Sequence, residues 1–234
     1  MKNLAMITVL IFLMGLVSPA LAQNCKFFFP SEEGAEMEIT FYNHRGKVQF
    51  VQTQKITDKK QSGNATILEV QQNMNMEKED EDISTNYEVR CEDGKFYMDM
   101  KSFISNMDMG DMQQSDEMDL EITSDSWVFP SDMEVGMTLP PTTMEVTLGG
   151  SGFDMMTTSV TMKNWKVEAR ETITTPAGTF DTFKISYDTE TKSVMTVESK
   201  DILWLAEDVG LVRAENYNKR GKLQGYQELT DLSR

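Results

Sequence analysis

Residue types suited to nucleophilic or metal chemistry are scarce in this chain. Its 234 residues include one histidine, His44, and two cysteines, Cys25 and Cys91. Cys–His nucleophiles, Ser–His–Asp triads and most zinc sites draw on these residue types. No GxSxG, P-loop or HExxH motif occurs, and no GxGxxG follows an expected strand. We therefore expect no enzyme, name no catalytic residue, and predict that His44 lies solvated in a turn.

Residues 98–118 contain a cluster of methionines that suggests a metal site. Thioether sulfurs bind Cu(I), but the aspartates between these methionines are hard ligands that suit other metals. A calcium site of the EF-hand type does not fit this segment either. With Gly110 at the invariant glycine, the ligand positions would hold Ser105, Met107 and Met109. We therefore predict no metal and no cofactor, and keep a Cu(I) binder as a third hypothesis. The methionines are Met98, Met100, Met107, Met109, Met112 and Met118.

The same segment carries the spacing of a short helix. Four of its apolar residues follow the i, i+3, i+4, i+7 pattern, and Gly110 could end the helix. Methionine is flexible, so such a helix could cover an apolar ligand, although the simplest interpretation is that these side chains fill gaps in a core. The candidate ligand-binding residues are Met100, Phe103, Ile104, Met107 and Met112.

The N-terminus has the pattern of a secretory signal peptide over residues 1–22. Lys2 precedes an apolar run that ends in Ala-Leu-Ala, which predicts cleavage before Gln23. An uncleaved anchor is the alternative, but the run is short for a bilayer. A lipoprotein needs cysteine directly after the cleavage site, and Cys25 comes two residues too late. We expect a periplasmic or secreted protein, without a transmembrane segment after cleavage, and a single β-rich domain over 23–234.

The expected export of the protein predicts the state of its two cysteines. Cys25 and Cys91 form an even pair, and an oxidising compartment favours their disulfide over two buried free thiols. The net charge of −16 argues against nucleic acid and anionic membrane surfaces as partners.

The body of the chain alternates apolar and polar residues at period two. Turn residues separate these stretches, including Asp93-Gly94 and the Pro176–Gly178 corner. No helix-length amphipathic segment lies between them, so we expect a meander of about ten antiparallel strands without βαβ units. The clearest alternations are Met37, Ile39 and Phe41; Trp165, Val167 and Ala169; and Phe183, Ile185 and Tyr187.

Two segments near opposite ends of the chain resemble each other. Residues 42–52 (YNHRGKVQFVQ) and 217–227 (YNKRGKLQGYQ) are identical at seven of eleven positions. A duplication would explain this, but nothing else in the two halves aligns, so we favour two hairpins that share the same turn residues.

Several short motifs in a fixed order resemble a family of exported bacterial proteins, the TapB-like or DUF3108-like group. They are residues 127–131 (WVFPS), 135–140 (VGMTLP), 175–180 (TPAGTF), 183–185 (FKI) and 204–213 (WLAEDVGLVR). The resemblance implies a mainly β fold, an open, curved antiparallel sheet similar to the half-barrels of lipoprotein carriers. It also implies short helices that partly close a concave apolar face. The family offers no established catalytic residues.

A curved sheet with a methionine-rich helix favours one function over two others. We expect the concave face to bind a lipid, another apolar or amphiphilic ligand, or the apolar segment of an envelope protein. The alternative is a structural or adhesive envelope protein that binds no ligand.

Overall fold

The computed structural model describes residues 25–76, 83–99, 119–150 and 153–234. The expected signal peptide and the expected helix with Met100, Phe103, Ile104, Met107 and Met112 lie outside these ranges. Within them the chain forms thirteen strands and no helix. The strands are β1 (Glu36–Asn43), β2 (Val48–Ser62), β3 (Ala65–Met76), β4 (Ile83–Glu92), β5 (Lys95–Asp99), β6 (Asp119–Ser124), β7 (Ser126–Pro130), β8 (Thr142–Gly150), β9 (Phe153–Thr175), β10 (Gly178–Lys192), β11 (Thr196–Ala206), β12 (Gly210–Asn218) and β13 (Leu223–Ser233).

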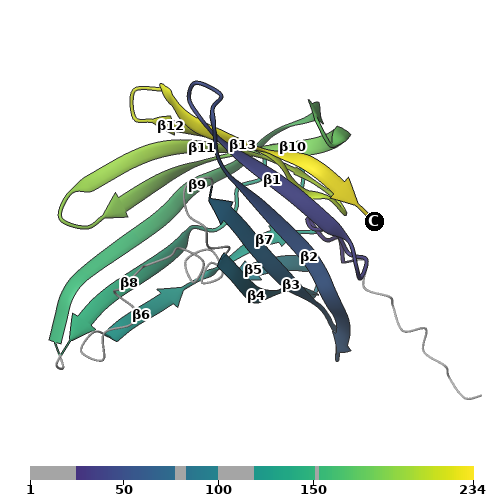
Figure 1. Cartoon of the computed structure of the whole chain (residues 1–234), viewed down its shortest axis with the longest axis horizontal. Coiled ribbons are helices and arrows are strands. Elements are labelled where there is room, and N and C mark those ends of the chain that lie inside the picture. Colours follow the sequence, from purple (N-terminus) through teal and green to yellow (C-terminus); the bar gives the residue numbers. More distant parts are fainter. Residues whose placement is uncertain (1–24, 77–82, 100–118, 151–152) are drawn as a thin grey trace, which may run out of the picture.

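All thirteen strands belong to one antiparallel sheet, in the order β6-β8-β9-β10-β11-β12-β13-β1-β2-β3-β4-β5-β7. The sheet curls so strongly that its two edges face each other, as Figure 1 shows. These edges, β6 and β7, are consecutive in the chain and are separated only by Asp125. The Ser124 hydroxyl donates to Asp99 Oδ1 at 3.0 Å and thereby links β6 to β5 across the seam. The predicted open, curved antiparallel sheet is confirmed.

The expected number of strands was too low. The alternation at Trp165, Val167 and Ala169 belongs to β9, a strand of 23 residues, and β6 and β7 are short strands with no long alternating run. Strands this short carry too few residues for a period of two to be recognised.

Alternation along the strands separates an inner face from an outer one. In β1, Met37 and Ile39 are 1% and 3% exposed, whereas their neighbours Glu36 and Glu38 are half-buried. The inner faces of the two halves of the sheet meet across the interior and form the main apolar core. A smaller apolar cluster surrounds Met144 on β8.

A segment before β1 fills one end of this interior. The Phe28 ring lies 6.4 Å from that of Phe96, 6.0 Å from that of Phe129 and 6.1 Å from that of Phe183, all edge-on. Gly210 passes close to this segment, because a Cβ there would lie 3.3 Å from the Phe28 carbonyl oxygen. Its φ of +97° also favours glycine.

The predicted disulfide between Cys25 and Cys91 is confirmed, with a Cα–Cα distance of 5.8 Å. Cys91 lies on β4 and is fully buried. The bond therefore attaches the phenylalanine segment to the wall of the sheet at the end that this segment fills.

The two similar segments form the same turn. Asn43 Oδ1 accepts hydrogen bonds from the backbone N–H groups of Arg45 and Lys47. Asn218 Oδ1 accepts from those two and four residues after it in the same way. The two similar segments therefore form the same turn geometry, as the hairpin interpretation predicts.

Candidate functional site

A cavity of about 420 Å³ lies inside the curved sheet. Small-molecule sites are concave, mostly apolar and of roughly 300–1,000 Å³, so this cavity has the size and character of one. Its walls come from strands far apart in the sheet, which places it on the inner face. The apolar lining includes Phe28, Phe29, Met37, Ile39, Phe41, Phe50, Phe96, Met98, Trp127, Phe129, Leu203, Leu205, Leu211 and Ala214.

Three glutamines form a polar patch on the inner face of β2 and β3. Gln52 and Gln54 donate from their side-chain nitrogens to Gln72 Oε1, at 3.0 and 2.8 Å. Their side chains are 6%, 6% and 4% exposed, and Gln52 and Gln54 line the cavity. The period of two dictates this arrangement, because Gln52 and Gln54 face the same way and Gln54 pairs with Gln72 across the strands.

Aromatic pairs flank the cavity on two sides. Phe41 and Phe50 stack with ring centroids 4.0 Å apart, and Trp165 and Tyr187 stack at 3.9 Å. Burial and then the nearby Asp201 carboxylate raise the pKa of Tyr187 well above its ordinary value. Tyr187, which belongs to the lining, therefore stays neutral near pH 7.

Two acidic residues, Asp201 and Glu215, belong to the lining, and the Asp201 carboxylate is satisfied by neutral donors. Asp201 accepts from the Thr189 hydroxyl at 2.7 Å, the Ser199 hydroxyl at 3.2 Å and Asn216 Nδ2 at 2.7 Å. No Lys or Arg side chain belongs to the lining formed by the described residues. The lining is therefore mostly apolar, with neutral amides and two acids, but without Lys or Arg among the described residues.

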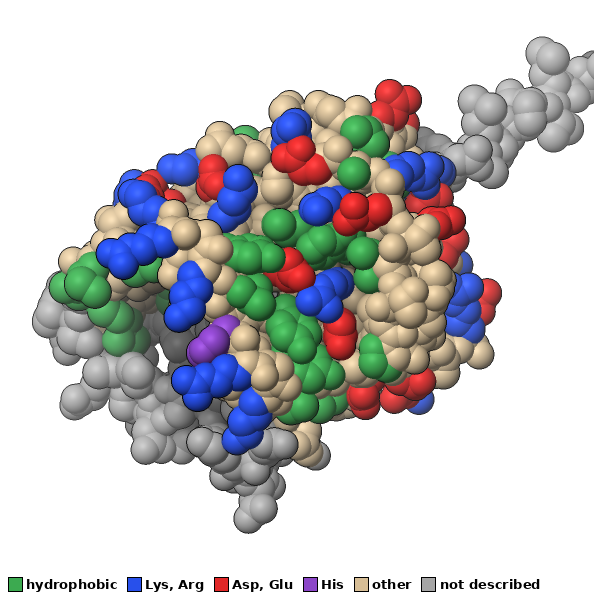
Figure 2. All heavy atoms as spheres, turned by 90° about the horizontal axis from the view of Figure 1, so that it is seen from above, with side chains coloured by type: hydrophobic (Ala, Val, Ile, Leu, Met, Phe, Trp, Pro, Cys, Tyr) green, Lys and Arg blue, Asp and Glu red, His purple; other side chains and the backbone are tan. Residues whose placement is uncertain are grey.

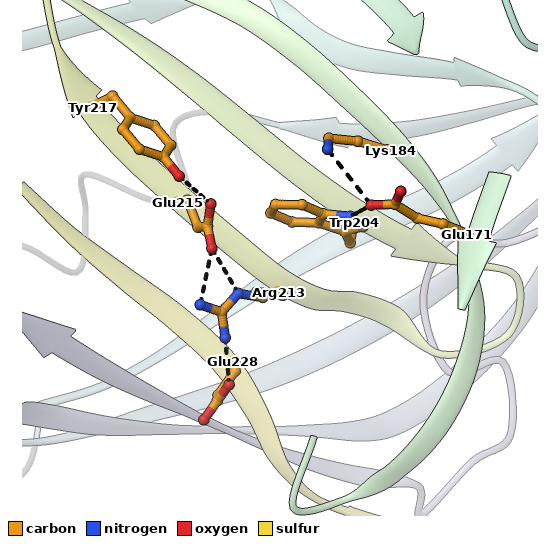
Figure 3. Close-up of polar contacts among 7 residues, drawn as sticks. All are labelled: Glu171, Lys184, Trp204, Arg213, Glu215, Tyr217 and Glu228. Carbon is orange, nitrogen blue, oxygen red and sulfur yellow. Dashed lines mark hydrogen bonds and ion pairs between the residues drawn. The ribbon is translucent and has the colours of Figure 1, made fainter. Parts of the chain in front are cut away.

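A charged network lies on the opposite, convex face of the sheet (Figure 3). Trp204 points outward, because its neighbours Leu203 and Leu205 line the cavity. Its Nε1 donates to Glu171 Oε1 at 2.5 Å, and Lys184 forms an ion pair with the same oxygen at 3.6 Å. The Trp204 side chain is thus covered by charged neighbours.

The network continues on β12 and β13, where two of its residues, Glu215 and Tyr226, also belong to the cavity lining. Arg213 donates to Glu228 at 2.8 Å and to Glu215 at 2.9 Å, and its guanidinium lies 4.7 Å from the centre of the Tyr226 ring. Tyr217 donates its hydroxyl to Glu215 at 2.5 Å. Figure 2, which shows this face from above, has hydrophobic side chains interspersed with both charge types. Every charge in the network is partnered, so the network stabilises the outer face rather than supplying a reactive group.

A second hollow, of about 560 Å³, lies at the tips of β10–β12 and has a different character. Its charged residues pair with one another: Lys163 contacts Glu190 at 2.8 Å, and Lys219 contacts Glu198. Hydrogen bonds from Lys163 and Lys192 lower the pKa of Glu190 to about 2. This hollow holds satisfied ion pairs and is a weaker candidate for binding an apolar molecule.

The predicted site residues Met100, Phe103, Ile104, Met107 and Met112 lie outside the described residues, so their role in binding stays a prediction. The apolar members of the lining could be inferred from the strand pattern, but the three inward-facing glutamines could not.

His44 is exposed in the β1–β2 turn, as predicted. Within the described ranges, no three His, Cys, Asp or Glu side chains are grouped as a metal site would require. The same ranges include no helix with the length and hydropathy of a membrane crossing.

Comparison with known proteins places this fold in a family. A family model described as DUF3108-like matches residues 32–229. The chain belongs to the DUF3108-like family. None of the curated proteins matches it.

Two crystal structures resemble this DUF3108-like protein, each with a TM-score of 0.73 over 90% of this chain and 100% of the other. One is a Bacteroides fragilis protein, described as a candidate exported protein with a YmcC-like fold, at 22% identity. The other is a candidate lipoprotein of Parabacteroides distasonis, at 24% identity. At these identities the likeness shows the fold.

Proposed function

We propose that this protein is exported and binds an apolar or amphiphilic molecule inside the curved sheet. The cavity of about 420 Å³ supports the binding, since fourteen of its lining side chains are apolar and they come from both halves of the sheet. The signal-peptide pattern of residues 1–22 supports export, and so do the descriptions of the two similar structures as a candidate exported protein and a candidate lipoprotein.

The test uses the full chain, expressed in a bacterium with its signal sequence. Mass spectrometry of the purified product measures the N-terminus, which we expect at Gln23. An intact Met1, or a lipidated Cys25, would contradict the expected cleavage.

Binding is measured by native mass spectrometry and by displacement of an apolar fluorescent probe. Leu211→Trp places a larger side chain in the cavity, whereas Val194→Trp makes a similar change on a hairpin tip that is 89% exposed. We expect Leu211→Trp to weaken probe binding at least tenfold and Val194→Trp to leave it unchanged. Equal effects, or no bound molecule in any variant, would refute the proposal and favour the structural or adhesive alternative. A stoichiometric Cu(I) adduct in place of a lipid would favour the metal hypothesis.

A further inference from the structure

We propose that the ligand carries an uncharged acyl amide or ester group within an apolar chain, and that Gln52 and Gln54 recognise this group. This inference rests on the proposed function and names the chemical class that the same cavity accepts.

The glutamine patch has hydrogen-bonding capacity to spare. The two bonds to Gln72 Oε1 use one acceptor atom, and Gln52 Oε1, Gln54 Oε1 and the Gln72 amide nitrogen have no partner among the described residues. The Thr85 hydroxyl, on the residue opposite Gln72 in β4, is also buried without a partner in the described part of the chain. Gln52 and Gln54 line the cavity, so their remaining hydrogen-bonding capacity is available to a ligand there.

Charge excludes the commonest amphiphile heads. A buried carboxylate or phosphate needs a cation or several donors, and the described lining offers no Lys or Arg. The Asp201 carboxylate in the same lining would also repel an anion. A neutral group loses less hydration energy on burial and is not repelled by Asp201. The side-chain amides of Gln52 and Gln54 both donate and accept hydrogen bonds, which suits an acyl amide or ester.

The position of the glutamines selects a polar group in the middle of the ligand. Along β2, Phe50 follows on the side of the β1–β2 turn, where it stacks on Phe41. On the other side, Gln54 pairs with Met37, which lies near Phe28. The polar patch therefore has apolar walls on both sides, and these suit two apolar arms joined by an acyl linkage.

The experiment compares three probes of equal heavy-atom count: N-butyldodecanamide, hexadecanoate and octadecane. Affinities are measured at pH 8 by displacement of the same fluorescent probe. We expect the amide to bind roughly tenfold or more tightly than hexadecanoate, because only the anion loses its hydration without a partner. Hexadecanoate, but not the amide, should bind more tightly as its carboxylate is protonated at lower pH.

The variant Gln52→Met/Gln54→Met removes the patch at nearly constant volume. It should weaken amide binding roughly tenfold and leave octadecane binding unchanged. Gln224→Met is the control, since Gln224 is exposed on β13 outside the cavity. If the double variant does not fold, the ranking of the three probes on the unaltered protein still decides.

The failures of the two proposals are distinct. Hexadecanoate binding as tightly as the amide, or an amide preference that survives in Gln52→Met/Gln54→Met, would overturn the inference while the cavity still binds. No binding of any of the three probes would overturn the proposed function itself.

Discussion

Reduction of the disulfide should destabilise the protein without changing its native structure. Cys25 and Cys91 are 66 residues apart in sequence, and the bond attaches the segment of Phe27, Phe28 and Phe29 to β4. These three rings are 6%, 2% and 3% exposed, so their packing also holds the segment in place when the bond is absent. The main effect of the bond is therefore on the unfolded chain, whose conformations it restricts.

The loop length sets the expected magnitude. Closing a loop of this size removes unfolded-state entropy worth about 4 kcal/mol at 25 °C. Reduction should lower the free energy of unfolding by about 3–4 kcal/mol, because the reduced chain gains this freedom on unfolding. The unfolded chain also becomes more expanded, so the dependence on urea should steepen slightly.

The assay is equilibrium urea denaturation, followed by tryptophan fluorescence, with and without a reductant. Cys25→Ala/Cys91→Ala is the control: it should match the reduced protein to within about 1 kcal/mol and should not respond to the reductant. A loss below about 1 kcal/mol on reduction would refute the reasoning, since it would mean that the bond hardly restricts the unfolded chain. A changed near-ultraviolet spectrum of the reduced native state would refute the claim that packing alone keeps the segment in place.

Three further predictions concern packing, titration and turns. Phe28→Ala should cost about 3–5 kcal/mol in urea denaturation, because it leaves a cavity among three aromatic rings, whereas the exposed Val194→Ala should cost less than about 0.5 kcal/mol. The raised pKa of Tyr187 keeps its proton bound in the folded state where the unfolded state loses it, so stability should fall as pH rises above about 10. Melting temperatures between pH 8 and 11 should decline less steeply for Tyr187→Phe, and an unchanged decline would contradict this origin. Asn43→Ala and Asn218→Ala should each cost about 0.5–1.5 kcal/mol, since each removes two turn hydrogen bonds, and unequal losses beyond that range would contradict the equivalence of the turns.

Local elements were predictable because their physics is local. The alternation of Met37 and Ile39 with glutamates follows from a strand with one buried face, and it is visible without any partner strand. The turns at Asp93-Gly94 and at Asn43 use residues that favour those backbone conformations by themselves. The disulfide followed from compartment and cysteine count, which need no coordinates.

Pairing over long distances was not predictable in the same way. β1 pairs with β13 although nearly the whole chain separates them, and β6 and β7 lie at opposite edges although they are neighbours in sequence. These partners are chosen by the curvature of the whole sheet, which no window of residues encodes. The family resemblance supplied that curvature, and the strand patterns alone did not.

Some residues around the cavity break the rule that apolar side chains mark the buried face of a strand. That rule places polar residues outside, yet Gln52, Gln54 and Gln72 face inward, and Trp204 faces outward beneath charged neighbours. Replacing the three buried glutamines by apolar side chains would stabilise a core that has no other role. Each amide loses its hydrogen bonds to water on folding, and the hydrogen bonds among the glutamines replace only some of them. Stability does not explain the patch, and places where a sequence breaks its own pattern tend to be functional. Tests of the proposed ligand binding therefore begin at these three glutamines.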